Sequence, residues 1–336
     1  MKNGLLLSFL LLAQLEALPL PQTRPQTKTQ PKMELKEPAP QNWDLFADFL
    51  IWYASEKPSS NWANNTLTTV NQLNFTDHVD VATAAFDWDL GFRAGVGYTM
   101  EHDRWDTQLY WSWFRTTAHN AIPTNNSPSN TFYLEFDGSF LNGDMFLGKG
   151  GRIDWDLLYN MVDWELGRNC AISRALSLRP FIGIKGGWIH QTINAKVDLV
   201  SFIGTEKLQN RFWGIGPSGG LNTRWEMGRF SAHSLNLLGE FATGMLWGNW
   251  NVKDVYTNPT IEIPVKSDVT SLGSLTLRGF LGIGWDIHTC RYGFALKLGY
   301  EMQIWFNQLR LPTLQQLPVH GDLTLQGGKF NARFDF

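Results

Sequence analysis

The 336-residue chain is short of cysteine, of charge and of long apolar runs. Its two Cys residues are too few for a disulfide-stapled scaffold or for a metal site with four thiolate ligands. Charged residues make up 18% of the chain, below the usual quarter, and the net charge of −3 supplies no basic excess, which argues against nucleic-acid binding. Beyond the N-terminus, no segment approaches the roughly 20 apolar residues of a spanning helix, which excludes a bundle of membrane helices.

The N-terminus has the features of a secretion signal. Lys2 gives it a positive start, an apolar run follows, and Ala17 offers a small residue for cleavage. The run is too short for a membrane span, so residues 1–17 are predicted to be a signal peptide, with a buried helix of a cytosolic protein as the alternative. Residues 18–42 carry six prolines among Gln, Thr and Lys, and this composition predicts an extended periplasmic tether.

Aromatic residues make up 14% of the chain, include 16 Trp, and recur in alternating segments. In WDLGFRAGVGYTM (88–100), large apolar side chains occupy every second position, with Asp, Gly, Arg and Thr between them. This period of two predicts β-strands. Segment 153–166 changes phase after Met161, which indicates a bulge or an early strand end. The alternating segments are 43–53, 88–100, 105–114, 153–166, 176–188, 212–225, 234–247, 275–285, 294–304 and 325–336.

The connections between these segments alternate between short and long. The short ones lie near 100–104, 167–175, 226–230 and 287–293, and the long ones near 54–86, 115–152, 189–211, 248–273 and 305–322. This layout is typical of an antiparallel up-and-down transmembrane β-barrel with tight periplasmic turns and long outer loops. We therefore predict a barrel of about ten strands over residues 43–336, all-β in class. The segment FYLEFDG (132–138) could belong to an extra hairpin, which would make twelve strands.

Pairs of aromatic residues mark both ends of the apolar faces. Their spacing of about 10 residues suits an apolar band about 25 Å tall on tilted strands, with the rings at the headgroup levels. A soluble β-sandwich would also alternate, but it predicts neither these aromatic pairs nor the alternating connections. The predicted aromatic girdle consists of Trp88, Tyr98, Trp105, Trp113, Trp213, Trp225, Trp247 and Trp285.

The chain closes on the alternating strand LQGGKFNARFDF (325–336). A barrel in lipid must pair its last strand with its first, because an open edge leaves backbone groups unsatisfied. We therefore expect this strand to pair with residues 43–53. Phe330, Phe334 and Phe336 resemble the C-terminal signal by which the outer-membrane assembly machinery recognises its substrates.

Three stretches resemble a known family: LFADFLIWYASE, WDLGFRAGVGYTMEHDRWDTQLYWSWFRTTA and RFWGIGPSGGLNTRW. They are similar to the pore-forming major outer membrane proteins of Legionella and chlamydia-like bacteria. The similarity runs in the same order from about residue 43 to 336 and is most specific at the 88–118 hairpin. It implies a general porin of an intracellular Gram-negative bacterium and supplies no catalytic residues. The proline-rich tether is less typical of the family.

Charged side chains opposite the apolar faces are predicted to point into the lumen. They could line a water-filled pathway and set its field, or pair off and plug a narrow barrel. Glycines on the same face are expected to leave room, which favours a small pore, and the mixed signs predict weak ion selectivity. The predicted pore-lining residues are Asp89, Arg93, Asp106, Arg179, Lys185, Glu240, Arg278, Lys297 and Glu301. The same parity applies to Asp44, Asp48, Asp154, Asp156, Arg224 and Arg333.

No motif in the chain points to catalysis, a cofactor or a metal ion. Ten-stranded barrels include proteases with Asp and His at the extracellular rim. Asp286 and His288 fall in a predicted periplasmic turn, the wrong end, and the Asp-His-x-Asp stretch at 77–80 is common by chance. Cys170 and Cys290 both fall in predicted periplasmic turns, where a disulfide, a cross-link to a neighbour and free thiols are all possible.

The predicted function is passive diffusion of small polar solutes or ions across a bacterial outer membrane. The alternative is a non-conducting barrel that serves as an adhesin or envelope scaffold through its long outer loops. The expected partners are outer-membrane lipid and lipopolysaccharide, the barrel-assembly machinery, small polar solutes and a second copy of the chain in a homo-oligomer.

Overall fold

The computed structural model describes residues 42–57, 61–71, 74–100, 104–134, 143, 148–289, 292–310 and 320–336. The predicted signal peptide and nearly all of the predicted tether lie outside these residues. The described part of the chain contains no helix long and apolar enough to cross a membrane.

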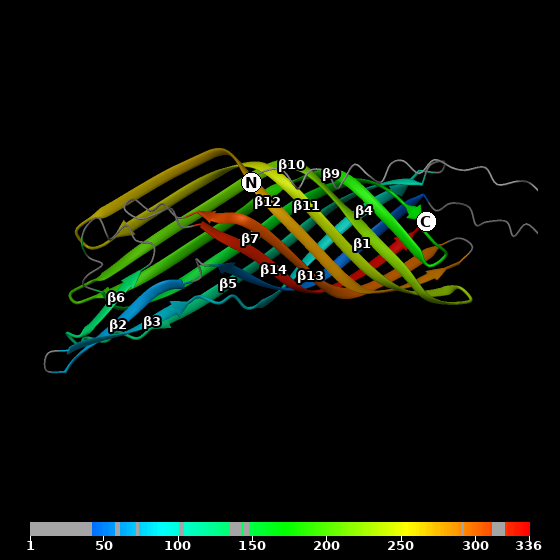
Figure 1. Cartoon of the computed structure of the whole chain (residues 1–336). Coiled ribbons are helices and arrows are strands. Elements are labelled where there is room, and N and C mark those ends of the chain that lie inside the picture. The colour runs from blue at the N-terminus through cyan, green and yellow to red at the C-terminus, as the bar shows by residue number, and fades with distance from the viewer. Residues whose placement is uncertain are drawn as a thin grey trace, which may run out of the picture. The chain divides into compact units, whose positions relative to one another are not determined.

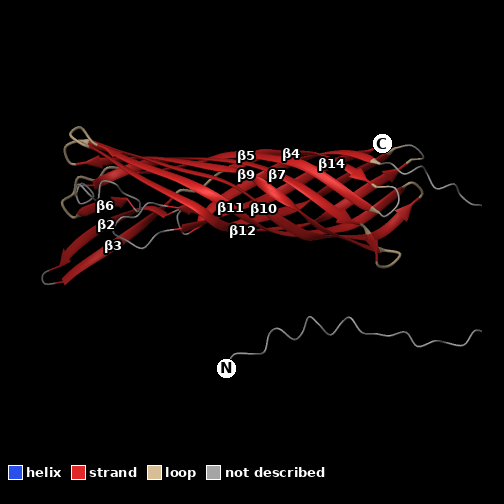
Figure 2. Cartoon of the chain, turned by 90° about the horizontal axis from the view of Figure 1, so that it is seen from above, coloured by secondary structure: helices blue, strands red, loops and turns tan. Residues whose placement is uncertain are grey.

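Ten antiparallel strands form a closed barrel, as the alternation predicted (Figures 1 and 2). Each strand pairs with its neighbours along the chain, and the ring closes where β1 pairs with β14. The barrel strands are β1 (Trp43–Lys57), β4 (Trp88–Thr99), β5 (Trp105–Ile122), β7 (Gly148–Arg168), β9 (Leu176–Leu199), β10 (Ile203–Phe230), β11 (His233–Thr257), β12 (Glu262–His288), β13 (Gly293–Arg310) and β14 (His320–Asp335).

The last strand closes the ring against the first, as the sequence predicted. Phe330 on β14 lies directly opposite Phe49 on β1, and the paired register continues to Asp44 and Asp335. Beyond it, the backbone N–H of Phe336 donates to the carbonyl of Trp43 at 2.9 Å. The final phenylalanine is therefore held in the backbone ladder, and the edge that would face lipid is satisfied.

The strands are strongly staggered around the barrel. Following directly paired residues once around the ring from Gly293 returns to β13 at Trp305, 12 positions further along that strand. Such a stagger in a ten-stranded barrel requires tilted strands, which are visible in Figure 2. Residues at one height are consequently offset by about one position per strand from their direct partners.

A small second sheet lies outside the ten-stranded ring. It consists of β2 (Asn61–Asn71), β3 (Asn74–Thr83) and β6 (Asn130–Leu134), in the order β3-β2-β6. The segment considered for an extra barrel hairpin thus contributes β6 to this sheet, and the twelve-strand alternative is wrong. A two-residue strand, β8 (Cys170–Ala171), pairs with the start of β9.

Two of the expected long loops are strands. Residues 189–199 and 203–211 continue β9 and β10, and the two strands are joined through residues 200–202 alone. Likewise β11 and β12 run to Thr257 and from Glu262. The prediction failed because the outward side chains of these extensions are polar, so the lipid-facing pattern stops although the backbone ladder continues.

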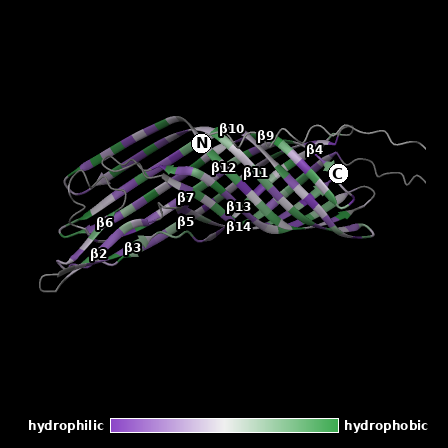
Figure 3. Cartoon of the chain, viewed as in Figure 1, coloured by the Kyte–Doolittle hydropathy of each residue, from purple (hydrophilic) through white to green (hydrophobic). Residues whose placement is uncertain are grey.

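The expected bulge at 153–166 is also absent. β7 keeps a continuous register with β5 from Gly151 to Arg168. The phase change after Met161 reflects a change in the barrel interior, which is apolar beside residues 153–161 and charged beside Asp163 and Glu165. Colouring by hydropathy shows the alternation along the other strands (Figure 3).

Candidate functional site

The outward face carries aromatic side chains near both ends of the apolar band. The predicted girdle residues Trp88, Trp213, Trp225 and Trp247 are more than half exposed. Trp213 lies directly opposite Trp188 across the β9–β10 pair. At the periplasmic end the ring of Tyr98 lies 4.9 Å from that of Trp43. The same outward parity applies to Tyr98, Trp105, Trp113 and Trp285. That the girdle residues lie at the level of the lipid headgroups stays a prediction.

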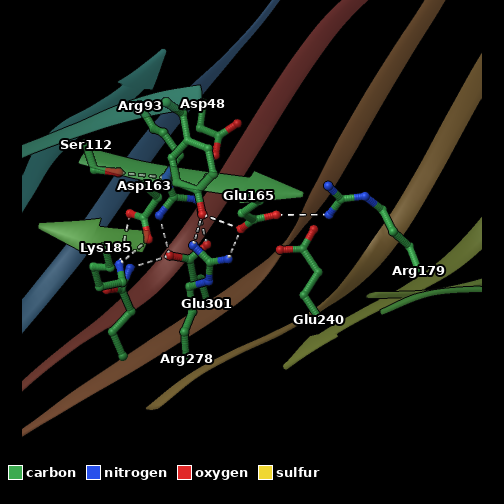
Figure 4. A network of polar contacts seen from close by, with 12 residues as sticks. Asp48, Arg93, Ser112, Asp163, Glu165, Arg179, Lys185, Glu240, Arg278 and Glu301 are labelled. Atoms are coloured by element: carbon green, nitrogen blue, oxygen red, sulfur yellow. Dashed lines mark hydrogen bonds and ion pairs between the residues drawn. The ribbon is translucent and has the colours of Figure 1, made fainter. Parts of the chain in front are cut away.

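The inward face carries a network of buried charges at the middle of the barrel (Figure 4). Arg93 on β4 is 3% exposed and is held from three sides. Its Nη1 lies 2.9 Å from Oδ2 of Asp48, its Nη2 lies 2.8 Å from Oε1 of Glu301, and its Nε donates to Ser112 at 2.8 Å. A charge in so enclosed a place needs such partners, because its desolvation would otherwise be prohibitive.

Glu165 on β7 organises a second part of the network. It accepts from Arg179 at 2.9 Å, from Arg278 at 3.2 Å and from the hydroxyl of Tyr110 at 2.7 Å. Arg278 also donates to the Tyr110 oxygen at 2.7 Å. Asp106 is the further partner of Arg179. Glu165 thereby links strands β5, β7, β9 and β12 across the interior.

Two lysines complete the charged layer. Nζ of Lys329 lies 3.2 Å from Glu301, 3.4 Å from Asp48 and 3.4 Å from Glu240. Nζ of Lys185 lies 2.7 Å from Oδ1 of Asp163. Charges of both signs therefore neutralise one another. The term charged layer refers to these ion-paired residues around Arg93, Glu165, Lys185 and Lys329.

A cavity of about 300 Å³ lies on the periplasmic side of the charged layer. Its walls reach the periplasmic ends of the strands at Asn169, Arg333 and Asp335. Lys297 also lines it, and no carboxylate among the described residues forms an ion pair with this amine. The cavity is polar, large enough for several water molecules, and bounded on its inner side by the charged layer.

On the extracellular side of the charged layer, apolar side chains fill most of the interior, alongside buried polar residues such as Glu56, Gln191 and Glu206. Trp52, Trp155, Trp250 and Trp305 are each at most 1% exposed. The ring of Tyr159 lies 5.8 Å from that of Trp305, and its hydroxyl donates to Gln303 at 3.1 Å. We call this part the aromatic layer; it joins the charged layer at Gln303, which also donates to Glu301. Together with Phe114, Phe212, Leu246 and Leu325, these side chains form a packed core.

The inward glycines do not leave the room that the sequence suggested. A methyl group added to Gly95 would lie 2.5 Å from the ring of Phe46 and 2.6 Å from Cβ of Tyr110. At Gly282 it would meet the ring of Phe280 at 2.6 Å. Aromatic rings from adjacent strands thus occupy the space above these glycines, and the expectation of an open lumen beside them is wrong.

Most predicted lumen residues lie together in the interior. Arg93, Arg179, Glu240, Arg278 and Lys297 line the cavity, while Lys185, Glu301 and Asp106 belong to the ion pairs beside it. Asp89 pairs in register with Trp52, which places it at the aromatic layer. Whether any of these residues lines a conducting path stays a prediction.

Two predicted lumen residues lie on the outside, which is a correction. Asp154 contacts His119 at 2.7 Å and Asp156 contacts Arg115, all on outward positions of β5 and β7. Asp163 and Glu165 are the acids that β7 does place inside, and sequence reasoning missed them together with Tyr110 and Lys329. The sequence did carry a sign of these inward acids, namely the change of phase after Met161. A continuous strand whose inward neighbours change from apolar to charged explains that change better than a bulge does.

The catalytic alternatives find no support from geometry. Asp286 is paired with Arg224 and accepts from Asn236 at 2.6 Å, and the side chain of His288 lies outside the described part. Asp77 and the exposed pair His78–Asp80 (3.7 Å) lie on β3. Within the described residues, no group of three or more His, Cys, Asp and Glu is placed to bind a metal. Cys170 forms no disulfide with a described residue, and Cys290 lies outside the described residues, so their pairing stays open.

The chain is similar to a known protein family and to several solved barrels. The family model described as Legionella pneumophila major outer membrane protein precursor matches residues 37–336. No curated protein matches the chain. Among solved structures, the outer membrane protease OmpT from Escherichia coli is similar at 9% identity and a TM-score of 0.43, over 88% of this chain and 97% of that one. The Pseudomonas putida toluene transporter TodX follows at 7% identity and 0.29, over 89% and 91%. At these values the structural likenesses say nothing about what this chain binds.

Proposed function

This chain belongs to the Legionella major outer membrane protein family, and on that premise we propose that it is an outer-membrane pore for small polar solutes or ions, captured in a closed state. The observation that carries the proposal is the charged cavity of about 300 Å³ in the periplasmic half of the lumen. Its mixed signs suit passage without strong ion selectivity.

The cost of the charged layer supports this proposal. A buried ion pair contributes little to stability, and an apolar replacement of similar volume is often neutral or better. The same barrel packs the adjoining section of its lumen with Trp and Leu side chains, so an apolar filling is physically available to it. The dense set of ion pairs beside the cavity therefore favours a role that needs water, such as the passage of hydrated solutes.

In the closed state the barrier is the aromatic layer. A solute that reaches Arg93 from the periplasmic side meets Trp52, Tyr159 and Trp305 next. Each of these side chains is at most 1% exposed. Passage requires these rings to move aside. We expect wild-type protein in planar bilayers to give brief, small openings, and Trp305→Ala to give longer and larger ones. A sealed membrane with both proteins, each folded, would overturn the pore.

The aromatic layer favours a second candidate function. A barrel closed by a packed core serves well as a rigid anchor, and the β3-β2-β6 sheet projects from its extracellular end (Figure 1). In this reading the chain is a non-conducting scaffold or adhesin. Folded protein that never conducts, even with Trp305→Ala, favours the scaffold.

A further inference from the structure

Five exposed cations stand on the outward faces of five neighbouring strands. We call them the basic belt: Arg152 on β7, Lys196 on β9, Lys207 on β10, Lys253 on β11 and Lys266 on β12. All five lie in the strand extensions beyond the extracellular aromatic residues. Lys207 precedes Trp213 by six residues and Lys253 follows Trp247 by six. The belt is therefore outside the apolar band, on the extracellular side.

The strand register brings these cations together. Arg152 lies directly opposite Lys196, and Lys253 lies directly opposite Lys266. Lys207 lies opposite Asn194 and Val255, two positions from Lys196 and Lys253. It is thus the diagonal neighbour of both, at a separation of about 7–8 Å. The five side chains form one continuous row.

Like charges directly opposite one another destabilise an antiparallel pair. Two such pairs in one row favour a counter-ion. The outward carboxylates of these extensions include Asp198, which accepts from Thr124, and exposed Glu262. Asp268 pairs with Lys266 at 2.9 Å, whereas Asp154 and Asp156 on the same face are taken by His119 and Arg115. Among the described residues, no carboxylate lies within ion-pair distance of the other four belt cations.

We infer that the basic belt binds the phosphate groups of lipopolysaccharide in the outer leaflet. The Trp residues mark the headgroup level. Six residues along a tilted strand raise the belt about 15 Å above it, where the phosphorylated core sugars lie. Exposed Arg211, two residues from Trp213, stands between the two levels. A row of cations matched to a multiply phosphorylated saccharide gives charge complementarity that a neutral lipid cannot.

Binding by the detergent-purified full chain tests this inference. Native mass spectrometry would follow titration with purified lipopolysaccharide, and with the same material after chemical removal of its phosphates. We expect binding that weakens steeply with salt, and about thirtyfold weaker binding for Lys196→Ser/Lys253→Ser, which removes two charges at about 1 kcal/mol each. The matched control Arg174→Ser/Arg229→Ser removes two exposed cations at the periplasmic end and should bind as wild type. Equal binding by the belt variant, or by dephosphorylated lipopolysaccharide, would overturn the inference.

Thermal unfolding supplies a second readout. Without lipopolysaccharide, the belt variant should unfold at the same or a higher temperature than wild type, because its like-charge pairs are gone. With lipopolysaccharide, wild type should gain more than the variant. A variant that is less stable than wild type without lipid, and equally stabilised by it, contradicts the inference. Should the double variant fold poorly, Lys207→Ser alone removes the link between the two pairs and is tested in the same way.

Discussion

Arg93 on β4 and Glu301 on β13, 208 positions apart in the chain, form a bidentate ion pair inside the barrel. Nη1 donates to Oε2 at 3.1 Å and Nη2 donates to Oε1 at 2.8 Å. Both side chains are at most 4% exposed. The pair ties together two strands that are not neighbours in the ring, since β1 and β14 lie between them.

Removing one member of this pair should be costly. Glu301→Gln leaves the buried Arg93 guanidinium with Asp48 as its one carboxylate partner, and we expect a loss of about 3–5 kcal/mol in the free energy of unfolding. Urea unfolding in detergent micelles measures it. The charge-balanced control Arg93→Met/Glu301→Met leaves Asp48 to Lys329 and should lose much less. Equal losses in both variants would show that burial of charge is not the cause.

Truncating the aromatic layer should weaken and open the barrel together. Trp305→Ala removes a fully buried ring and should cost about 3–5 kcal/mol. The same change clears space beside Gln303, so single-channel conductance should rise. Leu281→Ala, on the lipid side and 65% exposed, is the control and should leave conductance unchanged. A rise in both variants would assign the leak to general loosening of the barrel.

Two glycines of different surroundings test the ring packing. Gly95→Ala forces a methyl group against Phe46 and Tyr110, and should cost about 1–3 kcal/mol of stability through overpacking. Gly279 has no heavy atom within 4 Å of an added methyl group. Gly279→Ala should therefore be neutral or slightly stabilising. Urea unfolding compares the two, and similar destabilisation by both substitutions contradicts the packing described for Gly95.

Depth in the membrane should set the cost of a charge on β14. Phe330 is 44% exposed and lies opposite Phe49, well inside the apolar band. Phe330→Arg should destabilise the folded barrel in lipid vesicles by about 2–4 kcal/mol, against about 0–1 for Phe336→Arg near the interface. Unfolding by guanidinium in vesicles distinguishes these values. Equal costs would mean that the two positions do not differ in depth.

The ladder of alternating strands was predictable because lipid imposes one rule on every outward position. That rule gave the ten strands, the closure of β14 on β1 and the outward Trp residues. Outside the membrane, outward positions no longer need to be apolar. Residues 189–199 keep their backbone pairing without apolar outward side chains, so they resembled a loop.

The interior was harder to predict, because its two halves obey different rules. The inward side of β7 is apolar through Met161 and acidic at Asp163 and Glu165, so one parity could not be assigned from the sequence alone. Asp154 and Asp156 were misplaced for this reason. Partners such as Arg93 and Glu301 are set by the stagger of the ring, which no local pattern contains.

The upward continuation of β9 to β12 changes what the cell presents to its surroundings. Proteases cut segments that can leave their structure and thread into an active site, but these residues already have their backbone partners on neighbouring strands. Protease treatment of intact cells should therefore leave the extended parts of β9 to β12 uncut. Because these strands are held in one conformation, antibodies against them should recognise conformational epitopes, which are lost when the chain is boiled.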